Sequence, residues 1–435
     1  MTRFIYAISG GNAAYGQDAQ VTANLRRVVG SGILVAVGYI DPGNWATDIA
    51  GGSGFGYGLL LVVIASAILA LGFQVLVSRL ALVSRLALAT GEDLATLTAR
   101  HLSPRTAKAA WLAGEAAILA TALAELIGGA IALRLLFNLP LLGGVAVTGV
   151  GTFAVLALTR GNADRHERVI AVLLSIVAAS FVFLLFKANP AWTDVAHGMA
   201  RTGQALRDPQ GFLIALGILG ATLMPHNLYL HSGSLAQRAR VLPADARDLA
   251  MRVARNDTVL SLGVAMLINS AIMIVAAASL SGSGIIVSSL DDAHAVIGQT
   301  FGIGAAIVFA IALYAAGQSS TITGVLAGRM LSQGFQINSG WSDRRRALAT
   351  RLIAGAVAAA LLAFTGGQDP DQLLVLSQVI LSLALPFALG PLVVLARRRQ
   401  VMGRHVLRGA WAWAAVVATV GIILLDGYLL VDMVL

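Results

Sequence analysis

Two short segments of this sequence join a helix-breaking proline to side chains that can bind a cation. Residues Asp41 to Asn44 read Asp-Pro-Gly-Asn, and residues Met224 to Asn227 read Met-Pro-His-Asn. Each segment lies in the middle of a long apolar run. Proline removes one helix hydrogen bond and pushes the residue before it out of the helical region. In an apolar medium such a break persists only where it lines a cavity, so we expect both segments to line one.

The side chains at the two breaks predict a site for a transition-metal cation. Asp41 is ionisable in mid-span, which marks a functional site, and Asn44 lies three residues after it. Unwound carbonyls near Gly38 and Ala221 add neutral oxygen ligands. Sites for Mg²⁺ or Ca²⁺ use oxygen alone, whereas the thioether of Met224 favours softer metals. Methionine in a membrane helix usually serves packing, but its place directly before the second proline favours a ligand.

Composition shows that membrane helices must carry these breaks. Of 435 residues, 57% are hydrophobic and 12% are charged. A soluble protein is typically about 25% charged. Apolar runs long enough to cross a bilayer recur along the chain, and the sequence therefore predicts an all-α polytopic membrane protein with 11 transmembrane helices. The segments lie near residues 30–52, 57–87, 107–136, 140–160, 168–187, 209–234, 257–280, 297–334, 346–365, 372–396 and 408–431.

The distribution of basic residues predicts the orientation. With the N-terminus inside, 26 of the 30 Lys and Arg residues fall on the inner side. Basic residues concentrate in cytoplasmic loops. We therefore expect a multi-pass protein of the cell (inner or plasma) membrane, with a cytoplasmic N-terminus and a C-terminus outside. Residues 1–29 show no pattern of a cleaved signal peptide.

Several classes of function are excluded. The chain has no cysteine, so it has no disulfide, thiolate metal site or redox motif. Neither lysine stands in a Walker A motif, so any uphill movement must draw on an ion gradient or a partner. The basic residues cluster between apolar runs, which indicates cytoplasmic loops rather than nucleic-acid binding. We expect a protein that is not an enzyme and needs no cofactor.

The two breaks predict an internal repeat. They lie at matching depth in spans 1 and 6, and five spans separate them, so the two halves have opposite topology. This is the pattern of a 5+5 inverted repeat with its site at the midplane. Two ordinary proline kinks are the alternative, which the matching positions and asparagines disfavour. We expect an N-tail at 1–29, a first repeat at 30–187, an external loop at 188–208, a second repeat at 209–396 and an eleventh helix with its tail at 397–435.

The paired motifs resemble the two signature motifs of the Nramp family of divalent metal-ion transporters. The surrounding sequence is also similar in span 1 and span 6, and in span 10 at residues 375–380 and 386–389. The resemblance covers residues 30 to 431, and it implies a LeuT-like fold that takes up Mn²⁺ and Fe²⁺, usually with protons. The implied metal ligands are Asp41, Asn44, Met224 and the carbonyl of Ala221, joined by Gln378 when the site occludes.

Span 3 carries two glutamates that predict a proton pathway. Unpaired glutamate inside a membrane suggests a proton relay. Glu125 has apolar neighbours and is the better candidate, whereas Glu115 either joins the relay or is solvated near the inner end of the span. Arg351 opens span 9. The family resemblance implies that Arg351 pairs with an acid of span 3, and the alternative is a basic residue flanking the membrane.

Span 6 carries two histidines, His226 and His231, five residues apart. They lie about 140° apart on a helix, which is not the arrangement of a metalloprotease. Histidine titrates near neutral pH, so both are candidates for gating or proton transfer. For His231 a structural hydrogen bond is the alternative.

The sequence departs from the family at the proton pathway. Many members carry an aspartate three residues before the position of Glu125, where this chain has Ala122, and a glutamine of span 2 falls on Leu80. We therefore expect a proton pathway that is altered or absent beside an intact metal site.

The sequence thus predicts a secondary transporter that imports divalent transition metals by alternating access. We expect a monomer in the lipid bilayer, whose partners are the metal ion and, if coupling is retained, protons. One alternative is a LeuT-like carrier of an organic substrate, but Asp41 would repel a substrate carboxylate. The other alternative is a channel or receptor. The paired broken helices disfavour it, because a pore does not need them.

Overall fold

The computed structural model describes residues 30–74, 82–158, 163–240, 247–280, 289–336, 342–366 and 370–434, and this part of the chain forms helices and no strand. Eight helical stretches in it are long and apolar enough to cross a membrane, and two shorter apolar helices accompany them. The first stretch, Pro42–Gln74, joins the second half of span 1 to span 2. It therefore contains parts of two predicted spans, which reconciles these ten stretches with the predicted eleven. The prediction of an all-α polytopic membrane protein is confirmed.

The first half of the chain contains spans 1 to 5. Span 1 is divided between α3 and α4, and span 2 between α5 and α6. The elements are α3 (Ser31–Gly38), α4 (Pro42–Phe55), η2 (Gly56–Leu59), α5 (Leu60–Gln74), α6 (Leu82–Thr90), α7 (Leu94–His101), α8 (Pro104–Phe137), α9 (Leu141–Leu158) and α10 (Ala163–Ala188).

The second half contains spans 6 to 11, and span 6 is divided between α13 and α14. A further break, at Pro386, separates α19 from α20 in span 10. The elements are α11 (Trp192–Ala200), α12 (Thr202–Ala205), α13 (Pro209–Thr222), α14 (Pro225–Ala239), α15 (Arg247–Leu280), α16 (Leu290–Phe301), α17 (Ile303–Gly334), α18 (Asp343–Phe364), α19 (Pro370–Ala384), α20 (Pro386–Arg397), α21 (Arg399–Met402), η4 (Gly403–His405) and α22 (Ala410–Val434).

Both predicted breaks form where proline follows a residue with extended backbone. Asp41 has φ −70° and ψ 165°, and its carboxylate accepts the N–H of Asn44 and so caps α4. Met224 has φ −84° and ψ 123° and precedes α14. In each case proline occupies the first turn of the new helix, where its missing N–H costs nothing. The local chemistry of the two motifs therefore accounts for both discontinuities.

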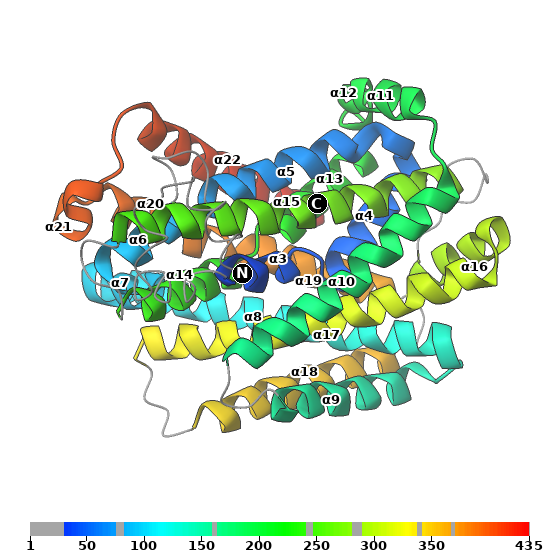
Figure 1. Cartoon of the computed structure of the whole chain (residues 1–435), viewed down its shortest axis with the longest axis horizontal. Coiled ribbons are helices and arrows are strands. Elements are labelled where there is room, and N and C mark those ends of the chain that lie inside the picture. Colours follow the sequence, from blue (N-terminus) through cyan, green and yellow to red (C-terminus); the bar gives the residue numbers. More distant parts are fainter. Residues whose placement is uncertain are drawn as a thin grey trace, which may run out of the picture.

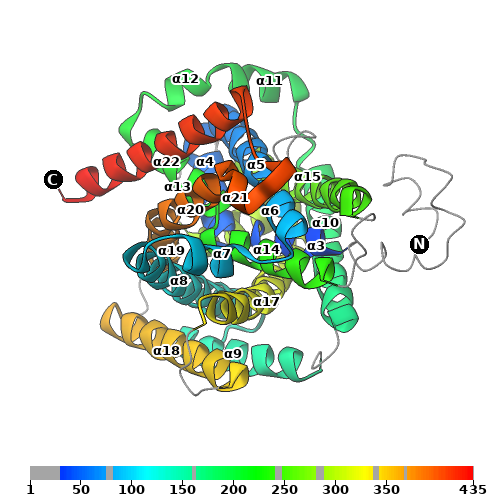
Figure 2. The ribbon, with the colours of Figure 1, turned by 90° about the vertical axis from the view of Figure 1, so that its left-hand side faces the viewer.

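The broken helices lie inside the bundle (Figures 1 and 2). In Figure 1, α3 and α4 follow one another through the middle of the molecule. Viewed along the bundle in Figure 2, α3, α14 and α17 lie near its centre, α9 and α18 pair at one edge, and α22 lies on the periphery. The small α11 and α12 cover one end of α4 and η2. The unwound segments are thus shielded from lipid by other helices, as an interrupted membrane helix requires.

A carboxylate of α15 holds the N-terminal end of α3. Asp257 Oδ2 accepts the backbone N–H groups of Gly30 at 3.0 Å and Gly32 at 2.8 Å. Gly32 lies directly against the backbone of Asp257 and Thr258, where a Cβ would come within 2.7 Å. A carboxylate at a helix N-terminus satisfies free N–H groups and complements the helix dipole. This half of span 1 is therefore anchored against α15.

Candidate metal site

The first break supplies a carboxylate and an amide that meet the second break. Asn44 Nδ2 donates to Asp41 Oδ1 at 2.9 Å and to the carbonyl of Ala221 at 3.2 Å. One hydrogen-bond donor thus stands where two acceptors from separate helices converge. A metal cation would take the place of that donor if the amide turned to present Oδ1. Asp41, Asn44 and Ala221, which the family resemblance implies as ligands, therefore lie together.

Two further side chains come from α14 and α19. Met224 precedes α14, and its Sδ lies 3.6 Å from Nδ2 of Asn227. Gln378 of α19 lies against Gly43, where a Cβ would come within 1.6 Å of Gln378 Nε2, so this close approach requires glycine. A similar approach between Gly128 of α8 and Pro42 holds the break against span 3, since a Cβ at 128 would lie 2.3 Å from that proline.

The five predicted ligands are enclosed. Asp41 and Ala221 are 0% exposed, and Asn44, Met224 and Gln378 are each 1% exposed. Asp41 Oδ2 and Gln378 Oε1 are buried acceptors without a hydrogen-bond partner. Buried acceptors are normally satisfied, so two unsatisfied ones suit a cation, and Met224 adds a thioether at the second break.

The described residues hold no group of three or more His, Cys, Asp or Glu side chains arranged for a metal. The candidate site is consistent with this, because it contains one carboxylate and is otherwise built from amides, a carbonyl and a thioether. Neutral ligands leave part of the charge of a divalent ion uncompensated. Binding at such a site is expected to be reversible enough for release, as transport requires.

Glu125 and Arg351 form a buried ion pair between α8 and α18. Arg351 is 5% exposed and Glu125 is fully buried, and Arg351 Nη1 donates to Glu125 Oε2. Thr321 of α17 adds a hydroxyl donor to the same oxygen at 3.1 Å, and its carbonyl accepts Arg351 Nη2 at 3.0 Å. Arg351 therefore contacts an acid of span 3 rather than standing at the membrane flank. A part for either residue in proton movement stays a prediction.

Glu115 lies apart from this network. It is half-buried in α8, where its Oε1 accepts Trp111 Nε1 at 3.1 Å and the hydroxyl of Ser332 at 3.4 Å. Ten residues of helix, about 15 Å, separate it from Glu125. The structure thus does not bring the two glutamates together.

The two histidines of α14 have different surroundings. His226 Nδ1 lies 3.4 Å from the hydroxyl of Thr121 in α8, and His226 Nε2 is buried without a partner. His231 contacts Gln74 of α5 through Nδ1, and its Nε2 lies 3.4 Å from the hydroxyl of Thr258. His231 thus makes structural hydrogen bonds, which the sequence analysis gave as the alternative to a role in gating or proton transfer. His226 thus faces span 3 at Thr121, the residue before the buried Ala122.

Gln74 is a site residue that the sequence analysis missed. It is fully buried, and its Nε2 donates to the hydroxyl of Tyr39 at 3.2 Å, so it links the first break to His231 of α14. Leu80, onto which the family glutamine was placed, lies outside the described residues. The sequence around it offers no motif, only a repeated hexapeptide, Leu-Val-Ser-Arg-Leu-Ala, at residues 76–81 and 82–87.

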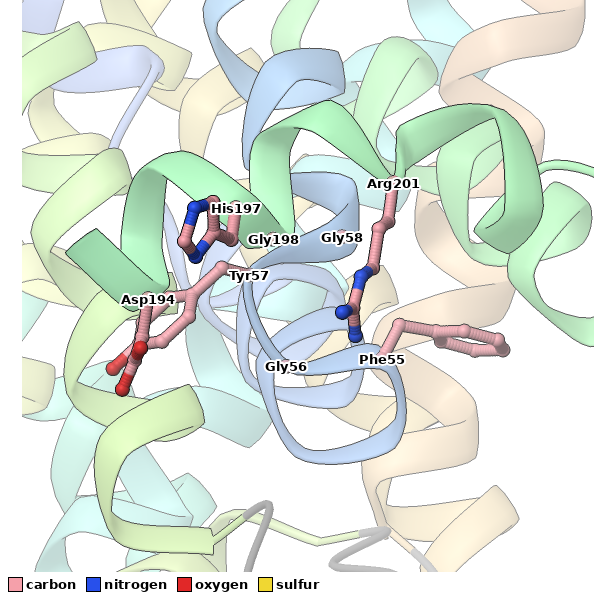
Figure 3. A pocket seen from close by; sticks show the side chains of 8 residues that line it. All are labelled: Phe55, Gly56, Tyr57, Gly58, Asp194, His197, Gly198 and Arg201. Atoms are coloured by element: carbon pink, nitrogen blue, oxygen red, sulfur yellow. The ribbon is translucent and has the colours of Figure 1, made fainter. Parts of the chain in front are cut away.

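A surface pocket of about 320 Å³ lies at the C-terminal end of α4 (Figure 3). Tyr57, Asp194 and His197 lie on one side of it, and Phe55 and Arg201 lie on the other. The side chains of Asp194, His197 and Arg201 are exposed. None of the predicted ligands lines the pocket, and its mixed charges do not form a cation site.

Comparisons with known proteins agree with the geometry. A family model described as natural resistance-associated macrophage protein-like matches residues 32–432. A divalent metal cation transporter MntH of Ralstonia nicotianae is 41% identical over 409 residues, which is 93% of this chain and 91% of that protein. The crystal structure of a manganese transporter of Eremococcus coleocola superposes with a TM-score of 0.82 at 32% identity, covering 94% of this chain and 87% of that one.

The fold is shared more widely. Mhp1, a nucleobase-cation-symport-1 family transporter, has a TM-score of 0.59 at 17% identity, with 92% of this chain and 88% of that chain covered. At this identity the likeness shows the LeuT-like architecture alone. The chain is therefore a polytopic transporter of the LeuT-like fold. It belongs to the Nramp family, as the paired break motifs predicted.

We expect the buried ion pair to be needed for stability. Arg351→Leu leaves Glu125 buried without its cation, which typically costs about 3–5 kcal/mol. The same change at the exposed Arg345 of α18 is the control and should cost less than about 0.5 kcal/mol. Thermal or denaturant unfolding of the purified protein measures both. If Arg351→Leu lowers the stability of the protein no more than its control does, the ion pair is not important for stability. If adding Glu125→Leu to Arg351→Leu restores the stability, the importance of the ion pair is supported.

Proposed function

We propose that this protein is a secondary transporter that imports Mn²⁺, and with it Fe²⁺ and similar divalent transition metals, by alternating access. The observation that carries the proposal is the meeting of the two breaks, where Asn44 donates to Asp41 and to the carbonyl of Ala221. Gln378 lies against the first break at Gly43, Met224 stands at the second break, and all five residues are buried. Relatives named as divalent metal cation and manganese transporters support it. Metal enters as substrate, and the protein needs no resident cofactor.

The proposed orientation places the N-terminus in the cytoplasm and the C-terminus outside, in the cell membrane. The supporting observation is the distribution of the 30 basic residues, 26 of which lie on the predicted inner side. The proposed unit of transport is the monomer, because the five ligands come from a single chain. The membrane potential then favours metal entry, at roughly 2.3 kcal/mol per charge per 100 mV.

Proton coupling is proposed to be weak. The route along span 3 has Ala122 at the position where many family members carry aspartate, and Glu125, one helical turn away at about 4.5 Å, is held by Arg351. His226 lies beside this gap, with Thr121 as its neighbour. A relay with a missing carboxylate in a low-dielectric medium is costly to bridge.

Removal of the carboxylate tests the site. Asp41→Ala should abolish Mn²⁺ uptake into proteoliposomes, because Asp41 carries the only formal charge among the proposed ligands. Asp208→Ala is the control, since Asp208 is exposed and only caps the outer end of α13. Near-normal uptake by Asp41→Ala would show that the ligand assignment is wrong.

Removal of the thioether tests selectivity. Met224→Ala should keep part of the Mn²⁺ uptake, because oxygen ligands remain, but it should lose discrimination against Ca²⁺ and Mg²⁺. Uptake of Mn²⁺ in excess Ca²⁺ or Mg²⁺ measures this. Met402→Ala provides a control at another buried methionine, far from the site. Unchanged competition in Met224→Ala would mean that the thioether only fills space.

Insertion of the missing carboxylate tests coupling. Acidification of the vesicle lumen during Mn²⁺ uptake, read with a pH dye, should be weak for the natural chain and stronger for Ala122→Asp. The reason is that aspartate restores a titratable group between His226 and Glu125. A protonophore and metal-free vesicles give the baseline. Strong acidification that Ala122→Asp does not increase would show that position 122 is no gap in the pathway.

A further inference from the structure

Six carboxylate side chains are buried in the described part of the chain, and one of them has no partner there. The six are Asp41, Asp48, Glu125, Asp257, Asp371 and Asp426. Five of them accept at least one hydrogen bond each. Asp48 is 2% exposed, no hydrogen bond or ion pair joins it to another described residue, and its Oδ2 is enclosed without a partner.

Asp48 stands in line with the metal site. It follows Asn44 by four residues in α4, and it follows Asp41, the N-cap of this helix, by seven. Four residues turn a helix by about 400°, so Asp48 lies within about 40° of the direction of Asn44 and about 6 Å further along the axis. Asn44, which donates to Asp41, thus stands between the two carboxylates along the helix.

The neighbours of Asp48 do not compensate its charge. The adjoining turns of α4 pack through Thr47 against Gly217 of α13 and through Gly52 against Met273 and Ala276 of α15. Arg134, a basic residue of the predicted outer side, pairs with Asp291 instead. An enclosed carboxylate without a counter-charge costs several kcal/mol. A carboxylate at the buried position of Asp48 is understandable if a cation neutralises its charge during part of the transport cycle.

We propose that Asp48 is a second cation-binding position, at which a divalent metal ion pauses between the outer surface and the site at Asp41. The inference rests on the proposed function and orientation, which place α4 in the outer half of span 1. Asn44 would pass the ion inward, since it is one turn from both carboxylates. The ligands at Asp48 are oxygen atoms of a carboxylate, an amide and water. Such a set binds Mn²⁺, Ca²⁺ and Mg²⁺ alike, so this position captures ions and leaves selection to Met224.

Equilibrium binding of Mn²⁺ to the purified full chain in nanodiscs, followed by the electron paramagnetic resonance signal of free Mn²⁺, tests this directly. The natural protein should bind two ions, the second at least about tenfold more weakly. Asp48→Asn should lose the weak ion and keep the tight one. Asp41→Ala should keep only a weak ion, and the double variant should keep none. Asp426→Asn, which removes a buried carboxylate of the peripheral α22, is the matched control and should bind as the natural protein does.

Transport and stability give two further measurements. Asp48→Asn should raise the KM for Mn²⁺ uptake about tenfold, as expected for loss of one favourable charge interaction, with competition by Ca²⁺ unchanged. Without metal, Asp48→Asn should melt at a higher temperature than the natural protein, because an unpaired charge has been removed. Asp48→Glu keeps the charge and should restore the second ion.

The outcomes separate this inference from the proposed function. If Asp48→Asn retains two bound ions and an unchanged KM, Asp48 carries a proton or serves packing, and the second position does not exist. If Asp41→Ala retains the tight ion, the ligand assignment at the breaks is wrong, whatever Asp48 does. If Asp48→Asn fails to fold while Asp48→Glu folds and binds one ion only, the inference is also overturned.

Discussion

The structure depends on how two helices can be interrupted inside an apolar medium. Each interruption frees backbone groups that water would otherwise satisfy, and each unsatisfied group costs several kcal/mol in lipid. Here asparagine amides from distant segments supply the missing donors. Asn269 of α15 donates to the carbonyl of Tyr39 at 2.8 Å at the first break, and Asn44 donates to the carbonyl of Ala221 at the second. The carbonyl of Ala221, which the break leaves without a helical hydrogen bond, is thus also available to a cation.

The charges around the site are arranged so that few remain uncompensated. Glu125 lies in the span that packs against Pro42, yet Arg351 and Thr321 hold its charge. Asp257 is occupied by the N–H groups at the start of α3. Among the described acids near span 1, Asp41, Asp48 and Glu125 each keep one oxygen without a hydrogen-bond partner, and Arg351 compensates the charge of Glu125 alone. The negative charge without a basic partner near span 1 therefore lies on Asp41 and Asp48.

The sequence could predict what local chemistry decides. Proline and asparagine in mid-span determine both breaks, and the distribution of arginine predicts an orientation by the positive-inside rule. The sequence could not decide whether Arg351 pairs with an acid of span 3 or flanks the membrane, because its partner Glu125 lies 226 residues away in the chain. Gln74 was missed because its partners, Tyr39 and His231, lie far from it in the chain. Asp48 was passed over because the first motif ends at Asn44, and only burial reveals that this aspartate lacks a partner.

The free oxygens on α4 separate two tasks that a single site would have to combine. Fast capture from dilute solution needs negative charge, which raises the local concentration of any cation. Discrimination needs a ligand whose preference differs between metals, and the thioether of Met224 at the second break is the proposed ligand of this kind. A tighter cage of carboxylates would capture ions well but would bind Ca²⁺ as readily and release metal slowly. One carboxylate among neutral ligands, approached along a face that carries another, can be selective and still let the ion leave.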